Sequence, residues 1–113
     1  MQKPDWMEEF PGAITVTDDE GKIIYMNKKA AQTFEAEGGL ALIGRNIMDC
    51  HRLESQEKIK KILESGKPNI YTIEKKGQKK LIFQTVWTEA GRVRGLVELS
   101  LEIPTAMPHF VRD

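Results

Sequence analysis

The chain has a single cysteine and no long apolar run, and these absences exclude several classes of protein. Cys50 alone cannot form an intramolecular disulfide framework or a multi-cysteine zinc site. No apolar segment reaches the length of a membrane span, and no N-terminal stretch has the pattern of a signal peptide. We therefore expect a cytoplasmic protein with no membrane partner, in which Cys50 is a reduced thiol.

The chain also lacks net charge, because 17 Lys and Arg residues balance 17 Asp and Glu residues. A balanced chain creates no long-range field that attracts nucleic acid, so we expect no nucleic-acid partner. No heptad pattern is present, and no signalling coiled coil is expected. With 113 residues, of which 40% are hydrophobic, the chain is long enough for one domain with a substantial core.

The most informative segment runs from Ile14 to Phe34. Two β-rich runs flank Asp18-Asp19-Glu20-Gly21, whose glycine can adopt the positive φ of a hairpin turn. Asn27 is a favoured N-cap, because its side-chain oxygen can accept a hydrogen bond from a free N–H of the first helical turn. The segment therefore predicts a strand, a tight turn, a second strand and a short helix.

A longer helix and three strands are expected after this segment. Ser55 is the expected N-cap of a helix over 55–65, which Gly66 and Pro68 end. Short helical turns are expected over 40–48. Strands are expected at 69–74, 79–88 and 93–103, with tight turns between them.

Alternation along the last two strands predicts which residues share a face. In the last strand we expect one apolar set to face the core and the polar residues between them to face solvent: Val97, Leu99, Leu101 and Ile103 against Glu98, Ser100 and Glu102. In the strand before it, two apolar sets point in opposite directions: Leu81, Phe83 and Trp87 against Ile82 and Val86. We therefore expect an apolar outer face on this strand, which is a candidate dimer surface.

The order of these elements resembles the PAS domain family. The resemblance rests on the Asn-x-x-Ala-x-x-x-Phe pattern of Asn27, Ala30 and Phe34 after the first hairpin, on Gly44, and on the two final hairpins. It implies an α+β fold over residues 13–103, with a five-stranded antiparallel sheet and short helices packed on one face. Residues 1–12 would be an N-terminal cap segment and residues 104–113 a C-terminal tail.

The resemblance implies sensing and signal transduction, and we expect no enzymatic activity. A small ligand or a partner would occupy a pocket between the inner sheet face and the helices, and the change would pass to an effector protein or domain. The alternative is a ligand-free module that forms a homodimer through the outer sheet face or docks a partner. The expected pocket residues are Ile14, Val16, Phe34, Ile43, Ile47, His51, Ile59, Leu63, Phe83, Leu99 and Leu101.

Two cofactors known in this family give opposite expectations. Photochemical flavin-binding members carry a Gly-x-Asn-Cys-Arg-Phe-Leu-Gln signature, whereas this chain has Gly44-Arg45-Asn46-Ile47-Met48-Asp49-Cys50-His51, so a photochemically active flavin is not expected. Haem-binding members use a histidine on the helical side of the pocket. His51 could supply that bond, and Met48 or Cys50 a second one. The alternative is that His51 bonds a helical turn and that both sulfur side chains fill the core.

Two further features have simple structural explanations. Cys50 and His51 are adjacent, and neighbouring side chains diverge, so a nucleophile–base pair is not expected. Lys75, Lys76, Lys79 and Lys80 form a basic hairpin tip, which could bind phosphate or an acidic partner. We interpret it as a solvated turn.

Overall fold

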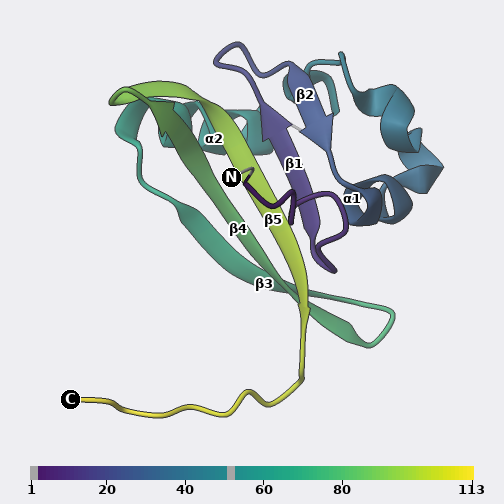
Figure 1. Cartoon of the computed structure of the whole chain (residues 1–113), viewed down its shortest axis with the longest axis vertical. Coiled ribbons are helices and arrows are strands. Elements are labelled where there is room, and N and C mark those ends of the chain that lie inside the picture. The colour runs from purple at the N-terminus through teal and green to yellow at the C-terminus, as the bar shows by residue number, and fades with distance from the viewer. Residues whose placement is uncertain (1–2, 51–52) are drawn as a thin grey trace.

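The computed structural model describes residues 3–50 and 53–113, and it contains one antiparallel five-stranded sheet with the order β2-β1-β5-β4-β3 (Figure 1). The strands are β1 (Ala13–Thr17), β2 (Ile23–Met26), β3 (Asn69–Lys75), β4 (Gln78–Glu89) and β5 (Arg92–Ile103). The α-helices are α1 (Lys28–Thr33) and α2 (Leu53–Ser65), and the 3₁₀ helices are η1 (Glu35–Glu37), η2 (Gly39–Leu42) and η3 (Ile47–Cys50). The predicted α+β fold is confirmed. None of the helices in the described ranges has the length and apolar character needed to cross a membrane.

The core lies between the helices and one face of the sheet, which we call the inner face. Helix α2 lies behind β4 and β5 in Figure 1, and its Ile59 and Ile62 are buried. Helix α1 contributes the fully buried Ala30, and the sheet contributes Ala13 and Leu96. The short apolar stripe of each helix is thus covered by the sheet, and this burial is the main stabilising contribution.

The strand register shows that our expectation for the sheet faces is wrong. Ala13 lies opposite Ser100, and Ser100 lies opposite Ile82. Directly opposed side chains of antiparallel strands share a face, so these three point toward the helices. The alternate residues point away from the helices, onto the outer face: Ile14, Val16, Leu81, Phe83, Trp87, Val97, Leu99, Leu101 and Ile103. Alternation identifies residues that share a face, but it does not say which face meets the helices.

The tight turns between the last three strands are confirmed, with two residues in each loop. Both central residues have positive φ: 53° and 79° at Lys76 and Gly77, and 53° and 79° at Ala90 and Gly91. This pattern matches the right-handed twist of the flanking strands. Helix α2, in contrast, begins at Leu53, so Ser55 lies inside the helix and is not its N-cap.

Asn27 connects the N-terminal segment to the sheet and to α1. Its Oδ1 accepts hydrogen bonds from the backbone N–H groups of Ile14 (3.0 Å) and Ala30 (2.9 Å), which confirms the predicted N-cap. Its Nδ2 donates to the carbonyl oxygens of Met7 and Gly12, both at 2.9 Å. The N-terminal segment, by which we mean residues 3–12, is thereby held across the outer face in front of β5 (Figure 1).

Candidate functional site

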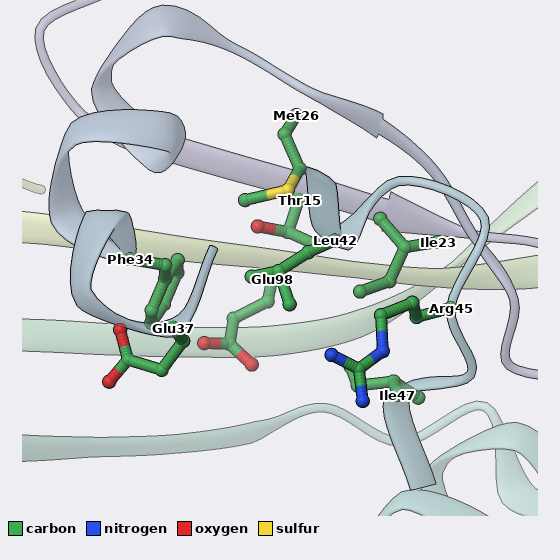
Figure 2. Close-up of a pocket in the computed structure, with 9 residues that line it drawn as sticks. All are labelled: Thr15, Ile23, Met26, Phe34, Glu37, Leu42, Arg45, Ile47 and Glu98. Atoms are coloured by element: carbon green, nitrogen blue, oxygen red, sulfur yellow. The ribbon is translucent and has the colours of Figure 1, made fainter. Parts of the chain in front are cut away.

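A cavity of about 450 Å³ lies between the inner sheet face and the segment from Phe34 to Ile47. Figure 2 shows the side chains that line it. Five are apolar (Ile23, Met26, Phe34, Leu42 and Ile47) and four are polar or charged (Thr15, Glu37, Arg45 and Glu98). A concave apolar site with a few polar groups is the usual form of a small-molecule site.

The wall of the cavity is attached to β2 by backbone hydrogen bonds. The Ile23 N–H donates to the Arg45 carbonyl and the Gly44 N–H donates to the Ile23 carbonyl, both at 2.8 Å. The Ile47 N–H donates to the Gly21 carbonyl at 2.7 Å. These bonds let short 3₁₀ turns, which have few internal hydrogen bonds, stand beside the sheet and leave a space behind them.

The floor of the cavity is formed by part of a row of polar side chains, which we call the polar row and which crosses four strands. Thr15, Glu98, Gln84 and Asn69 lie in register on β1, β5, β4 and β3. Asn69 Nδ2 donates to Gln84 Oε1, and Gln84 Nε2 donates to Glu98 Oε2, both at 3.0 Å. The amides are thus oriented in one direction, with donors toward the Glu98 carboxylate.

Opposite charges face each other across the cavity. In Figure 2 the Glu98 carboxylate and the Arg45 guanidinium both point into the space between them, and the Glu37 carboxylate stands at the rim. Among the described residues, the ion pairs are Lys28–Glu9, Lys29–Glu102 and Arg94–Glu89, so no direct pair joins Arg45 to Glu98. A ligand can therefore reach each charge without first breaking an ion pair between them.

A second cavity of about 290 Å³ shares Glu98 with the first. It lies between α2 and strands β3 to β5, and its lining is mainly polar: Ser55, Lys58, Ile59, Asn69, Tyr71, Gln84 and Glu98. Burial, and then the negative charge of Glu98, raise the pKa of Tyr71. Glu98 is thus the residue at which the two cavities meet.

The structure places only some of the predicted pocket residues at these cavities. Phe34 and Ile47 line the first cavity and Ile59 lines the second, although contact with a ligand stays a prediction for all three. Leu63 is half-buried against the core, and Ile43 is 42% exposed. Neither residue lines the first or the second cavity.

Five other predicted pocket residues are corrected by the register. Ile14, Val16, Phe83, Leu99 and Leu101 lie on the outer face, away from both cavities. Their neighbours along the strands, Thr15, Gln84 and Glu98, take the inward positions instead. Sequence reasoning missed these polar residues because it assigned Glu98 to the solvent face and gave Thr15 and Gln84 no role. Only the pairing partners reveal their place.

The predicted haem ligand His51 lies outside the described residues. Met48 is half-buried and packs against the core. Among the described residues, no group of three or more His, Cys, Asp or Glu side chains is arranged to hold a metal ion.

Comparisons with known proteins agree with this architecture. A family model described as a PAS domain matches residues 11–98. No curated protein sequence gives a significant match.

Three solved structures show the shared fold. The VqmA receptor of Vibrio cholerae has a TM-score of 0.68 at 14% identity, and the match covers 88% of this chain and 49% of VqmA. This chain therefore spans about half of VqmA, which has also been solved bound to DPO. The Aer2 receptor from Vibrio cholerae, a dual PAS-heme oxygen sensor, has a TM-score of 0.61 at 17% identity, over 82% of this chain and 95% of that one. The PAS domain of the histidine kinase ThkA has a TM-score of 0.63 at 23% identity, over 80% and 97% of the two chains.

Proposed function

This chain belongs to the PAS domain family, and we propose that it is a non-catalytic sensory module of the cytoplasm, which binds a small ligand and signals to an effector. The observation that carries the proposal is the cavity of about 450 Å³, with apolar walls and a polar floor. A tightly packed core without a cavity would instead favour the ligand-free alternative. The cavity therefore favours ligand binding.

The fold provides a physical route from the cavity to the rest of the molecule. A ligand shifts a conformational equilibrium only by its difference in affinity for the two conformations. The floor residue Glu98 lies on β5, and β5 leads directly into residues 104–113. A ligand that prefers one position of Glu98 would thus bias β5 and the tail that an effector could read.

The names of structural neighbours support the same type of function. VqmA is described among LuxR-type receptors and has been solved with DPO, and Aer2 is a PAS-heme oxygen sensor. The third neighbour is the PAS domain of a histidine kinase, ThkA. Their domains share this fold at low identity, so they support the class of function and not the ligand.

A matched pair of variants on η2 tests ligand binding. Leu42 is buried and lines the cavity, whereas Leu40, two residues earlier, is 60% exposed. We expect native mass spectrometry of the purified chain to detect a bound small molecule that Leu42→Phe excludes and Leu40→Phe retains. Retention of the molecule by a folded Leu42→Phe chain would contradict the proposal, as would a wild type that carries no bound molecule and binds no small organic probe on titration.

Haem is the second ligand class to test in the same preparation. Among the described residues that line the cavity, the Met26 thioether is the one sulfur or imidazole donor, and a methionine is a known protein ligand of haem iron. Bound haem would supply redox or gas-binding chemistry, while Phe34 and Leu42 would contact its apolar surface. A Soret band that His51→Ala abolishes would support haem, and a colourless protein would exclude it.

Dimerisation through the outer face is a second candidate function. The observation that favours it is a patch of half-exposed apolar side chains, which we call the outer patch: Val16, Leu81, Phe83, Trp87, Val97, Leu99 and Leu101. Contiguous apolar surface of this kind commonly marks a protein–protein interface. This patch consists of the residues that sequence alternation had assigned to the core, not of Ile82 and Val86.

A further inference from the structure

We propose that the ligand is a small organic amine, whose protonated nitrogen binds the Glu98 carboxylate while its apolar body lies against Phe34 and Leu42. This inference rests on the proposed ligand-sensing function and specifies the chemical class that the first cavity selects. It follows from three observations: the depth of Glu98, the orientation of its hydrogen-bond partners and the charge of the lining.

Glu98 is the deepest of the three charged groups at the cavity. It stands on the inner face of the strand β5 and is half-buried, whereas Glu37 and Arg45 are exposed. Exposed charges are screened by water and salt, while a partly buried charge is screened much less. The Glu98 carboxylate at the floor therefore contributes more to ligand selection than the exposed Arg45 and Glu37.

The polar row presents Glu98 as an acceptor. Gln84 must direct its NH₂ group toward Glu98, because its Oε1 already accepts the hydrogen bond from Asn69. An ionised carboxylate accepts several hydrogen bonds and donates none. No other hydrogen bond among the described residues reaches the Glu98 carboxylate, so it can still accept from a ligand N–H group.

The lining as a whole also favours a cation. Among the described residues that line the cavity, two carboxylates, Glu37 and Glu98, and one guanidinium, Arg45, leave one formal negative charge. The Phe34 ring is a further wall residue, and aromatic faces attract cations. A ligand carboxylate would form an ion pair with the exposed Arg45, but the less screened Glu98 carboxylate would repel it.

Three probes with one phenyl body and different head groups test the inference: 2-phenylethylamine, 2-phenylethanol and 3-phenylpropanoate. Each is titrated into the full chain, with affinity from calorimetry and location from backbone amide shifts in NMR. We expect the amine to bind roughly tenfold or more tightly than the alcohol, because a charge-assisted hydrogen bond is added. The shifts should concentrate at Thr15, Leu42 and Glu98.

Glu98→Gln and Glu102→Gln form a matched pair for this titration. The amide of Glu98→Gln keeps an oxygen for Gln84 but removes the charge, so the preference for the amine should disappear. Glu102 lies on the same strand, pairs with Lys29 at 3.2 Å and lines neither cavity, so its substitution should leave the preference unchanged.

The outcomes separate this inference from the proposed function. If the alcohol or the carboxylate binds in the cavity as tightly as the amine, the amine assignment is wrong and ligand sensing stands. The amine assignment is also wrong, and ligand sensing again stands, if no probe binds while a co-purified molecule is lost from the Leu42→Phe chain. If no probe binds and no molecule co-purifies, both fail. Amine binding that shifts amides elsewhere, or that survives Glu98→Gln unchanged, also overturns the inference.

Discussion

Asn27 shows how one side chain can satisfy several segments at once. It is completely buried, and its amide both accepts from β1 and α1 and donates to the N-terminal segment. Serine or aspartate could cap the helix, but neither combines two donors with an acceptor. An asparagine is therefore required here for more than its capping preference.

The substitution Asn27→Asp separates the cap from the other role. The carboxylate still accepts from Ile14 and Ala30, but it faces the Met7 and Gly12 carbonyls without a donor. We expect a loss of about 2 kcal/mol or more in the free energy of unfolding, because a buried charge and two carbonyls lose their partners.

Urea denaturation measures this loss, and Asn46→Asp is the matched control. Asn46 is only half-buried, and its Nδ2 donates one hydrogen bond, to the Glu20 carbonyl at 2.9 Å. Asn46→Asp should therefore lower the free energy of unfolding by clearly less than Asn27→Asp. Equal losses at the two positions would show that Asn27 acts as an ordinary cap.

At the scale of elements, the N-terminal segment and β2 are joined by a hydrogen bond from the Tyr25 hydroxyl to Glu8 Oε2, at 2.8 Å. Burial, this hydrogen bond and the negative charges of Glu8 and Asp5 raise the pKa of Tyr25 to about 12. The segment is thus attached by a bond that requires a protonated tyrosine.

This contact should weaken in alkaline solution. The pKa of Tyr25 is higher in the folded chain than its ordinary 10.0, so the folded chain holds the proton more tightly than the unfolded chain. The stabilisation is complete below pH 10.0 and is lost as the pH rises toward about 12. Tyrosinate absorbance, compared between the wild type and Tyr25→Phe, measures this titration.

Glu8→Gln provides the control for the cause of the shift. It removes the charge but keeps a hydrogen-bond acceptor, so the pKa of Tyr25 should fall while remaining above its ordinary value because of burial. A wild-type Tyr25 that titrates at its ordinary pKa would show that the N-terminal segment does not hold β2 in solution.

At the scale of the whole molecule, the sheet has an unusual distribution of polarity. Its inner face carries the polar row beside the cavities, whereas its outer face carries the outer patch, which the N-terminal segment covers only in part. The Leu101 side chain lies so close to Gly12 that a Cβ atom at that position would clash with it, and the neighbouring Ile14 is 3% exposed. The residues of the outer patch are nevertheless half-exposed. Burial of such an apolar surface by association is expected to be favourable.

We expect the chain to form a homodimer through the outer patch, and Phe83→Glu to produce monomers. A charge placed at the centre of an apolar interface would lose its hydration on association without gaining a partner. Sedimentation velocity over a range of concentrations measures the effect. Leu40→Glu, at an exposed apolar position on the helical side, should leave the dimer intact. A monomeric wild type, or a dimer that survives Phe83→Glu, would contradict this expectation.

The sequence by itself determined the order and nature of the elements. Local signals were sufficient for the first hairpin, the Asn27 cap, the end of α2 at Gly66 and the two-residue turns, because turn and cap preferences depend on neighbouring residues. The start of α2 is an exception, because it lies at Leu53 and not at the predicted Ser55. A serine is a favoured N-cap by residue type alone, so the sequence does not distinguish a cap from a position inside the first turn.

Only the tertiary structure decided which face of the sheet meets the helices. The alternation of Leu99 and Leu101 with Glu98 and Ser100 is compatible with either face, because a strand can turn over without changing its pattern. The choice depends on β1, whose Ala13 packs in the core and whose Thr15 pairs with Glu98 far along the chain. The polar floor of the cavity is thus a property of strand pairing, which no local segment of the sequence contains.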